Sequence, residues 1–148
     1  MGLRAVRWAI FVPVLFAGAA ASAHRPKVCT RDDAIHAEQA LDGLTDWRQA
    51  YNFFWRYDHC DDGAVAEGYD DRVVGLLTKQ WSTVRELAKL CRQDQAFQRF
   101  VLKHIDTLMS AQQADTIATN AQRNCPAGAA EICKRLKAAS IEVERRDE

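Results

Sequence analysis

One histidine of the chain directly follows an acidic residue, in the pair Asp58-His59. A histidine that is oriented by a carboxylate is the usual general base of hydrolytic enzymes. Adjacent residues do not face each other on a helix, so the pair by itself is weak support for this chemistry. A small secreted hydrolase that uses His59 with a nearby acid is therefore an alternative function, and no catalytic residue is assigned.

The same pair begins an acidic stretch, residues 58–71, which contains six carboxylates. Oxygen-rich loops suit calcium, and an EF-hand loop beginning at Asp58 would have an acid and a glycine at its fifth and sixth positions. The third and twelfth positions are Cys60 and Tyr69, where that loop needs acids. We therefore favour a solvated loop whose acids cap the next helix. A cation site and a partner-facing loop are the alternatives, and no metal ligand or cofactor is assigned.

Aromatic residues are concentrated just before the acidic stretch. Six of them lie between Trp47 and Tyr57, and on a helix they would cover an arc of about 200°, wider than a surface helix normally buries. We favour a central helix that packs on several sides; the alternative is that some rings stay exposed and anchor a partner, because Trp and Tyr are frequent at binding hot spots. The candidate partner-binding residues span the end of this helix and the acidic stretch: Trp55, Tyr57, Asp58, His59, Asp61, Asp62, Glu67 and Tyr69.

His104 belongs to an apolar stripe with helical spacing, which includes Phe97, Phe100 and Val101. This spacing predicts a hydrogen-bonded histidine in the core or at its boundary. The sequence has no G-x-S-x-G, H-E-x-x-H or paired C-x-x-C motif, so nucleophile-elbow, zinc-protease and dithiol redox sites lack support. An enzymatic function is therefore not the favoured interpretation.

The first 23 residues have the three parts of a secretory signal peptide. Arg4 and Arg7 form the positive region, and residues 8–20 form an uncharged apolar region. Residues 21–23, Ala-Ser-Ala, match the pattern of small residues that a signal peptidase cleaves. We therefore predict cleavage after Ala23 and export of the remaining chain.

The predicted mature domain covers residues 24–148 and lies in the periplasm or outside the cell. No later apolar run reaches the length of a bilayer span, so we expect a soluble domain without a membrane partner. Removal of the signal peptide takes away two arginines and no acid, which leaves 18 basic and 20 acidic residues with mixed signs along the chain. This balance argues against a nucleic-acid partner. The charged end from Glu144 is expected to fray.

All five cysteines lie in the mature domain, where an oxidising compartment favours disulfides. Thr30, with Asp33 three residues later, has nearly the form of a capping box, and Thr45 or Asp46 is expected to cap a second helix. The two helical segments, residues 31–43 and 46–57, are joined by a short turn and predict an antiparallel hairpin. Cys29 lies just before the first segment and Cys60 just after the second, so a bridge between them would close the open end of the hairpin. This is the first predicted disulfide.

The second predicted disulfide joins Cys125 to Cys133, which a tight turn at Pro126 would bring together. Cys91 is then left over on the inner face of its helix, where a buried free thiol behaves as a small hydrophobe.

Helical spacing continues through the rest of the chain. Apolar residues return from Val73, and the sequence that starts at Thr83 has the form of a capping box. Asp94 precedes the clearest amphipathic stripe, and two further helices are expected near residues 113–124 and after Ala129. The sequence therefore predicts a single all-α domain of about six short helices with two disulfides. We interpret it as an exported protein-binding module, such as an inhibitor or an immunity-type protein, whose partner is another exported protein.

Overall fold

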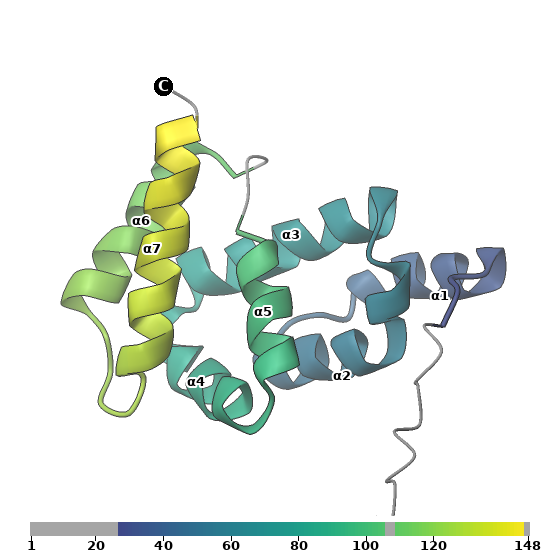
Figure 1. Ribbon diagram of the computed structural model, residues 1–148, viewed down its shortest axis with the longest axis horizontal. Helices are drawn as coiled ribbons and strands as arrows, with labels where there is room; N and C mark the ends of the chain where they lie inside the picture. The colour runs from purple at the N-terminus through teal and green to yellow at the C-terminus, as the bar shows by residue number, and fades with distance from the viewer. Residues whose placement is uncertain (1–26, 106–108, 147–148) are drawn as a thin grey trace, which may run out of the picture.

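The computed structural model describes residues 27–105 and 109–146 (Figure 1). These residues form seven α-helices and two short 3-10 helices without a strand, which confirms the all-α fold. The predicted signal peptide, residues 1–23, lies outside the described residues. None of the described helices combines the length and the apolar character that crossing a membrane requires. The helices are α1 (Arg31–Leu41), α2 (Trp47–Tyr57), η1 (Asp58–Cys60), α3 (Gly63–Lys79), η2 (Trp81–Thr83), α4 (Val84–Gln93), α5 (Gln95–Lys103), α6 (Ala111–Arg123) and α7 (Ala130–Arg146).

Side-chain caps fix the start of several helices. The Thr30 hydroxyl accepts a hydrogen bond from the backbone N–H of Asp33 (3.1 Å), and the Asp33 carboxylate accepts one from the backbone N–H of Thr30 (3.4 Å). This is the capping box expected at α1. The carboxylates of Asp46 and Asp94 cap α2 and α5 as predicted, and Ser110 caps α6. Each such cap stabilises its helix by about 1 kcal/mol.

The capping box that we predicted at the start of α4 is absent. Thr83 precedes the helix as expected, but its side chain does not cap it. The hydroxyl donates to the Gln80 carbonyl oxygen (2.7 Å) and accepts from the indole N–H of Trp47 (3.0 Å). A buried indole N–H needs an acceptor, and this tertiary hydrogen bond takes the place of the local cap.

The acidic stretch that we expected to be a loop is mostly helical, which corrects the prediction for residues 58–71. Its first three residues form η1, and α3 begins at Gly63, well before the expected start near Val73. The Asp62 carboxylate accepts a hydrogen bond from the Gly63 N–H (2.8 Å), so one acid does cap the next helix. The helix α3 has a buried face of residues four positions apart: Val65, Tyr69 and Val73. Five acids between Asp61 and Asp71 obscured this apolar spacing in the sequence.

The helix α2 contacts α1, α4 and α5 and contributes to an aromatic cluster with α3 and α5. Four of its six aromatic side chains are buried: Trp47, Phe53, Phe54 and Tyr57. The Phe53 ring lies 5.2 Å from the Tyr69 ring of α3, and the Phe54 ring lies 5.0 Å from the Phe100 ring of α5. For these residues the interpretation as a helix packed on several sides is confirmed.

The other helices lie on two sides of this aromatic cluster (Figure 1). At one end, α1 packs on α2 and α3. At the other, α6 and α7 lie side by side and contact α3, α4 and α5. The helix α7 extends to Arg146, so the charged end from Glu144 begins within this helix. Its fraying stays a prediction.

Both predicted disulfides are present. The Cys29–Cys60 bridge has an S–S distance of 1.98 Å and ties the residue before α1 to the end of η1. The Cys125–Cys133 bridge has an S–S distance of 2.02 Å and closes the turn between α6 and α7. Cys91 is a free, buried thiol of α4, and burial raises its pKa to about 12. The protonated thiol is a poor nucleophile, so Cys91 acts as a core residue.

Alanine substitutions at two glycines of α3 are expected to change the stability in opposite directions. A methyl group at Gly75 would meet no atom within 4 Å, whereas one at Gly68 would lie 2.4 Å from Cδ1 of the buried Leu41. We expect Gly75→Ala to raise the free energy of unfolding by about 0.5–1 kcal/mol, because alanine loses less backbone entropy in a helix. Gly68→Ala should lower it by about 1–2 kcal/mol through overpacking between α1 and α3. Urea denaturation measures both, and equal effects would contradict the close packing at Gly68.

Candidate functional site

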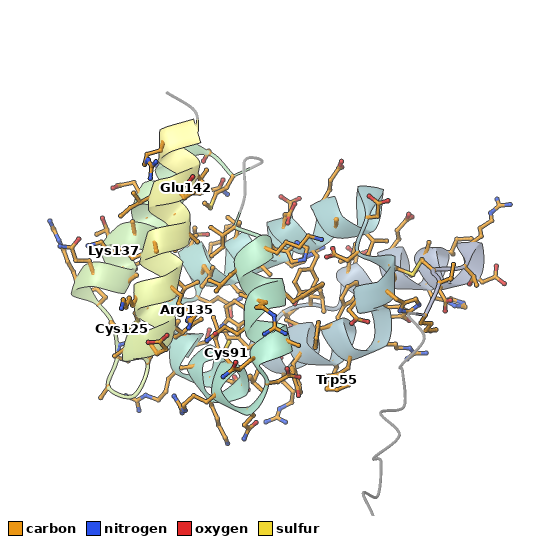
Figure 2. All side chains as sticks on the ribbon, in the orientation of Figure 1. Trp55, Cys91, Cys125, Arg135, Lys137 and Glu142 are labelled. Atoms are coloured by element: carbon orange, nitrogen blue, oxygen red, sulfur yellow. A yellow bond between two sulfur atoms is a disulfide. The ribbon has the colours of Figure 1, made fainter. Side chains whose placement is uncertain are left out.

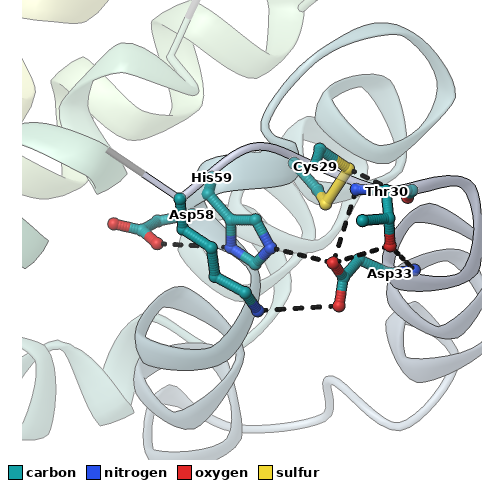
Figure 3. The surroundings of a disulfide bond; sticks show 7 residues. Cys29, Thr30, Asp33, Asp58 and His59 are labelled. Carbon is teal, nitrogen blue, oxygen red and sulfur yellow. Dashed lines mark hydrogen bonds and ion pairs between the residues drawn. A yellow bond between two sulfur atoms is a disulfide. The ribbon is translucent and has the colours of Figure 1, made fainter. Parts of the chain in front are cut away.

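The imidazole of His59 lies between two carboxylates beside the Cys29–Cys60 disulfide (Figure 3). Its Nε2 is 3.6 Å from an Asp33 oxygen, and its Nδ1 is 3.9 Å from an Asp58 oxygen. The side chain is 7% exposed. Each ring nitrogen therefore faces a carboxylate of the protein itself. This geometry holds the ring in place and suits a structural tie between α1 and η1 better than a base directed at a substrate.

A second histidine forms a more deeply buried cluster. Nδ1 of His104 lies 2.5 Å from Oδ1 of Asp70, and Nε2 lies 3.3 Å from Oδ1 of Asp61. The Lys103 ammonium donates to the other Asp61 oxygen at 2.6 Å. The His104 side chain is 2% exposed, and its ring packs against Tyr69 and Phe100 at centroid distances of 4.6 Å and 4.5 Å. The cluster joins the segment after η1 to α3 and to the end of α5, as expected of a core histidine with polar partners.

The imidazole of His104 and the carboxylate of Asp61 are in close polar contact without a well-aligned hydrogen bond. Neither Nε2 of His104 nor Oδ1 of Asp61 has a hydrogen-bond partner among the described residues, although the two atoms face each other at 3.3 Å. Burial by itself would raise the pKa of Asp61, but attraction from His104 and Lys103 outweighs it, so the pKa lies below its ordinary value. The carboxylate is therefore stabilised in its charged form.

The Asp33 carboxylate has a lowered pKa for a different reason. The hydrogen bond from the Thr30 hydroxyl (2.8 Å) is the main cause, with smaller contributions from the Thr30 N–H, Lys27 and His59, and the pKa falls to about 2. Asp33 thus caps α1 and faces His59 with the same charged group. Within the part of the chain that the structure describes, no three His, Cys, Asp or Glu side chains converge as metal ligands would.

These two carboxylates predict a loss of stability in acid. Because Asp33 and Asp61 have lower pKa values in the folded state than unfolded, the folded chain binds fewer protons. The contribution of Asp33 is complete above about pH 4 and is lost as the pH falls toward about 2, and the contribution of Asp61 is lost in the same direction. We expect the urea midpoint to fall steadily below about pH 4, and to fall less steeply in Asp61→Asn. A wild-type midpoint that is constant between about pH 5 and pH 3 would contradict this prediction.

The candidate partner-binding residues fall into two groups. Four of them are largely buried and serve the fold: Tyr57, His59, Asp61 and Tyr69. The Tyr69 hydroxyl donates to the Ala50 carbonyl oxygen (3.2 Å), and burial raises its pKa. The other four are exposed: Trp55, Asp58, Asp62 and Glu67. The structure therefore does not bring the eight residues together on one surface.

Trp55 is the exception to the packing of α2. Its side chain is 65% exposed, the largest exposed aromatic group of the described residues. The ring contacts Tyr51 edge-on at a centroid distance of 6.3 Å and Phe54 at 5.9 Å. Tyr51 in turn packs on the buried Phe97 of α5 at 4.9 Å. In Figure 2 Trp55 points away from the helices at the edge of the molecule, so a large ring is presented to solvent on a rigid base.

A groove between α2 and α4 lies on the same side of α2. Its volume is about 780 Å³ and its lining is rich in basic residues. Arg48 is on the same face of α2 as Trp55, because seven residues make nearly two helical turns. Tyr51, which contacts the Trp55 ring, donates a hydrogen bond to the Asp94 carboxylate (3.3 Å), and Asp94 directly follows Gln93, a lining residue of the groove. The lining residues are Arg48, Ser82, Thr83, Arg85, Glu86, Lys89, Leu90, Arg92 and Gln93.

Sequence reasoning missed this groove, although one signal was available. Arg85, Lys89 and Arg92 are spaced by four and three residues, which puts three cations on one exposed face of α4. Charge is also divided along the chain: residues 27–71 contain 11 acids and 4 bases, and residues 72–103 contain 2 acids and 7 bases. Because the net charge of the whole chain is close to zero, it does not reveal this separation of acidic and basic residues. The approach of Arg48 from α2 could not be foreseen, because it depends on how the two helices pack.

The chain matches no protein-family model, no curated protein and no solved structure.

Proposed function

We propose that this chain is an exported protein-binding module, of the kind that inhibits or masks another exported protein, and that it binds through the face of α2 that carries Trp55. The observation that supports this proposal is the exposure of Trp55 next to five other rings of α2 that are packed or partly packed. Tryptophan is enriched at the centre of protein–protein interfaces, where it buries a large area at a small entropic cost. The two disulfides are consistent with an oxidising compartment.

The rigidity of the Trp55 surroundings adds to this support. Its neighbours Tyr51 and Phe54 are themselves anchored on Phe97, and the Tyr51 hydroxyl is held by Asp94. A side chain on such a base loses little freedom on binding, so more of the contact energy appears as affinity. A hydrolytic site needs a general base paired with a nucleophile. The described residues on the Trp55 face of α2 do not include such a pair.

Capture from the exported fraction tests the proposal. Biotinylated mature protein serves as bait, beside Trp55→Ala and a control variant, Ile141→Ala, which removes an exposed apolar side chain of α7. Quantitative mass spectrometry should find a protein that the wild type and Ile141→Ala recover equally and that Trp55→Ala recovers about tenfold less, the loss of a hot-spot tryptophan. Both variants should keep the melting temperature within about 3 °C, because both side chains are at the surface. Equal recovery by all three baits would refute the proposal.

A further inference from the structure

The groove between α2 and α4 has the charge of an anion-binding surface. Four cations line it, with one acid, Glu86, whose carboxylate lies 4.0 Å from the Arg48 guanidinium. That contact is at the distance limit of an ion pair, and the Arg48 side chain is 72% exposed. Exposed pairs of this kind contribute little energy, so Glu86 leaves Arg48 available to another carboxylate.

One of the cations is fixed in place by the fold. The Arg92 guanidinium donates to the Gly128 carbonyl oxygen at 2.6 Å. Gly128 has a positive φ of 82° and lies in the turn that the Cys125–Cys133 disulfide closes. The disulfide-closed turn therefore orients Arg92 at one end of the groove, while Arg48 from α2 faces the other cations of α4. A groove with positioned charges binds with less ordering of its own side chains.

The floor of the groove is apolar at one point. Leu90 lines the groove and is 8% exposed, so the basic side chains surround a small apolar area. Arg48, on the α2 side of the groove, lies on the same face of α2 as the exposed Trp55.

Given the protein-binding function proposed above, on which this inference rests, we propose that the α2–α4 groove receives an acidic segment of the partner protein. Carboxylates of that segment pair with Arg48, Arg85 and Lys89, and an apolar side chain between them covers Leu90. Because the groove is positively charged, it favours a negatively charged segment. Trp55 supplies an apolar contact to the same partner. Charge complementarity of this kind raises the association rate and suppresses wrong partners.

The surrounding charges favour an acidic protein segment over a nucleic acid. Residues 27–71, which include α1, α2 and the start of α3, carry 11 acids against 4 bases. A nucleic acid that extended beyond the groove would meet this acidic half of the domain and be repelled, because duplex DNA carries a charge about every 1.7 Å. A short acidic segment ends within the groove and avoids that repulsion.

A model peptide tests the inference directly. The probe is a fluorescein-labelled peptide with four glutamates on each side of a central leucine, followed by fluorescence anisotropy at about 20 mM and about 150 mM NaCl. We expect binding to the mature domain that weakens with salt, and an affinity lower by about tenfold in Arg85→Glu/Lys89→Glu, since each reversal replaces an attraction by a repulsion. The control Lys134→Glu/Arg145→Glu makes the same charge change on exposed positions of α7 and should leave the affinity within about twofold.

Three results would overturn the inference. The first is equal peptide affinity in the groove variant and the α7 control. The second is tighter binding of a single-stranded oligonucleotide of equal charge, which would make the groove a nucleic-acid surface. The third is self-association of the wild type that Arg85→Glu/Lys89→Glu abolishes, which would make a second copy the occupant. Circular dichroism confirms that both double variants are folded.

The same variants separate this inference from the proposed function. If the captured partner is lost with Trp55→Ala and retained with Arg85→Glu/Lys89→Glu, the protein-binding function stands and the acidic-segment inference fails. If Trp55→Ala retains the partner, the capture experiment contradicts the proposed function. The peptide titration then still tests whether the groove binds an acidic segment. Loss of the partner with both variants supports both proposals.

Discussion

Replacing His104 with alanine is expected to lower the free energy of unfolding by about 3–5 kcal/mol. The imidazole lies between the carboxylates of Asp61 and Asp70, at 3.3 Å and 2.5 Å, and is 2% exposed. Without it, two largely buried carboxylates lose the group that they share, and Asp61 keeps the hydrogen bond from Lys103. The truncation also leaves a cavity beside Tyr69 and Phe100, which adds to the cost. Urea denaturation at about pH 7 measures the effect.

His36→Ala is the matched control, because His36 is an exposed histidine of α1. It should change the stability by less than about 0.5 kcal/mol. A double-mutant cycle with Asp70→Asn then isolates the pairing: in the Asp70→Asn background, His104→Ala should cost at least about 1 kcal/mol less than in the wild type. A cost of His104→Ala below about 1 kcal/mol would show that the cluster does not hold the three segments together.

Removal of the Cys29–Cys60 disulfide is expected to have a comparable effect. The bridge closes a loop across 31 positions of the sequence, and in the chain-entropy model its loss destabilises the domain by about 3.7 kcal/mol. Cys29→Ala/Cys60→Ala also frees the residue before α1, so the capping box of Thr30 and Asp33 loses its anchor to η1. The measurement is the urea midpoint and its slope for the double variant.

Cys125→Ala/Cys133→Ala is the comparison for this prediction. Its bridge spans 8 positions, and the same model gives a smaller loss of about 2.6 kcal/mol. The expected order is therefore wild type, then the variant without Cys125–Cys133, then the variant without Cys29–Cys60. The reverse order would mean that loop length does not decide the contribution of these bridges.

Four consecutive residues explain why both predictions concern the same region. Asp58 and His59 face each other, His59 faces Asp33, Cys60 is bonded to Cys29, and Asp61 pairs with the end of α5. The segment 58–61 thus contacts α1 through the disulfide and Asp33, and the end of α5 through Asp61. The residues whose types first indicated catalysis or cation binding are used by the fold itself, and the partner surface that we propose lies elsewhere, on α2 and α4.

The sequence predicted the local features well, because they depend on neighbours in the chain. The caps at Thr30, Asp46 and Asp94 are present, since each cap needs only the backbone of the following helical turn. Both disulfides followed from the length of two helices and one turn, and the buried free thiol of Cys91 followed from its place on an apolar stripe. The candidate surface was predicted only in part: Trp55 is exposed, whereas Tyr57 and Tyr69 belong to the core.

What the sequence determined by itself was therefore the helical class, the start of most helices and the cysteine pairing. Tertiary structure decided the role of each polar group, because the partners lie far apart in the chain: His104 meets Asp70 across 34 positions, and Trp47 takes the Thr83 hydroxyl across 36. A buried polar group must find a partner, and which one it finds depends on how the helices pack. The same packing brings Arg48 of α2 to the three cations of α4 and leaves Trp55 exposed on the same face of α2.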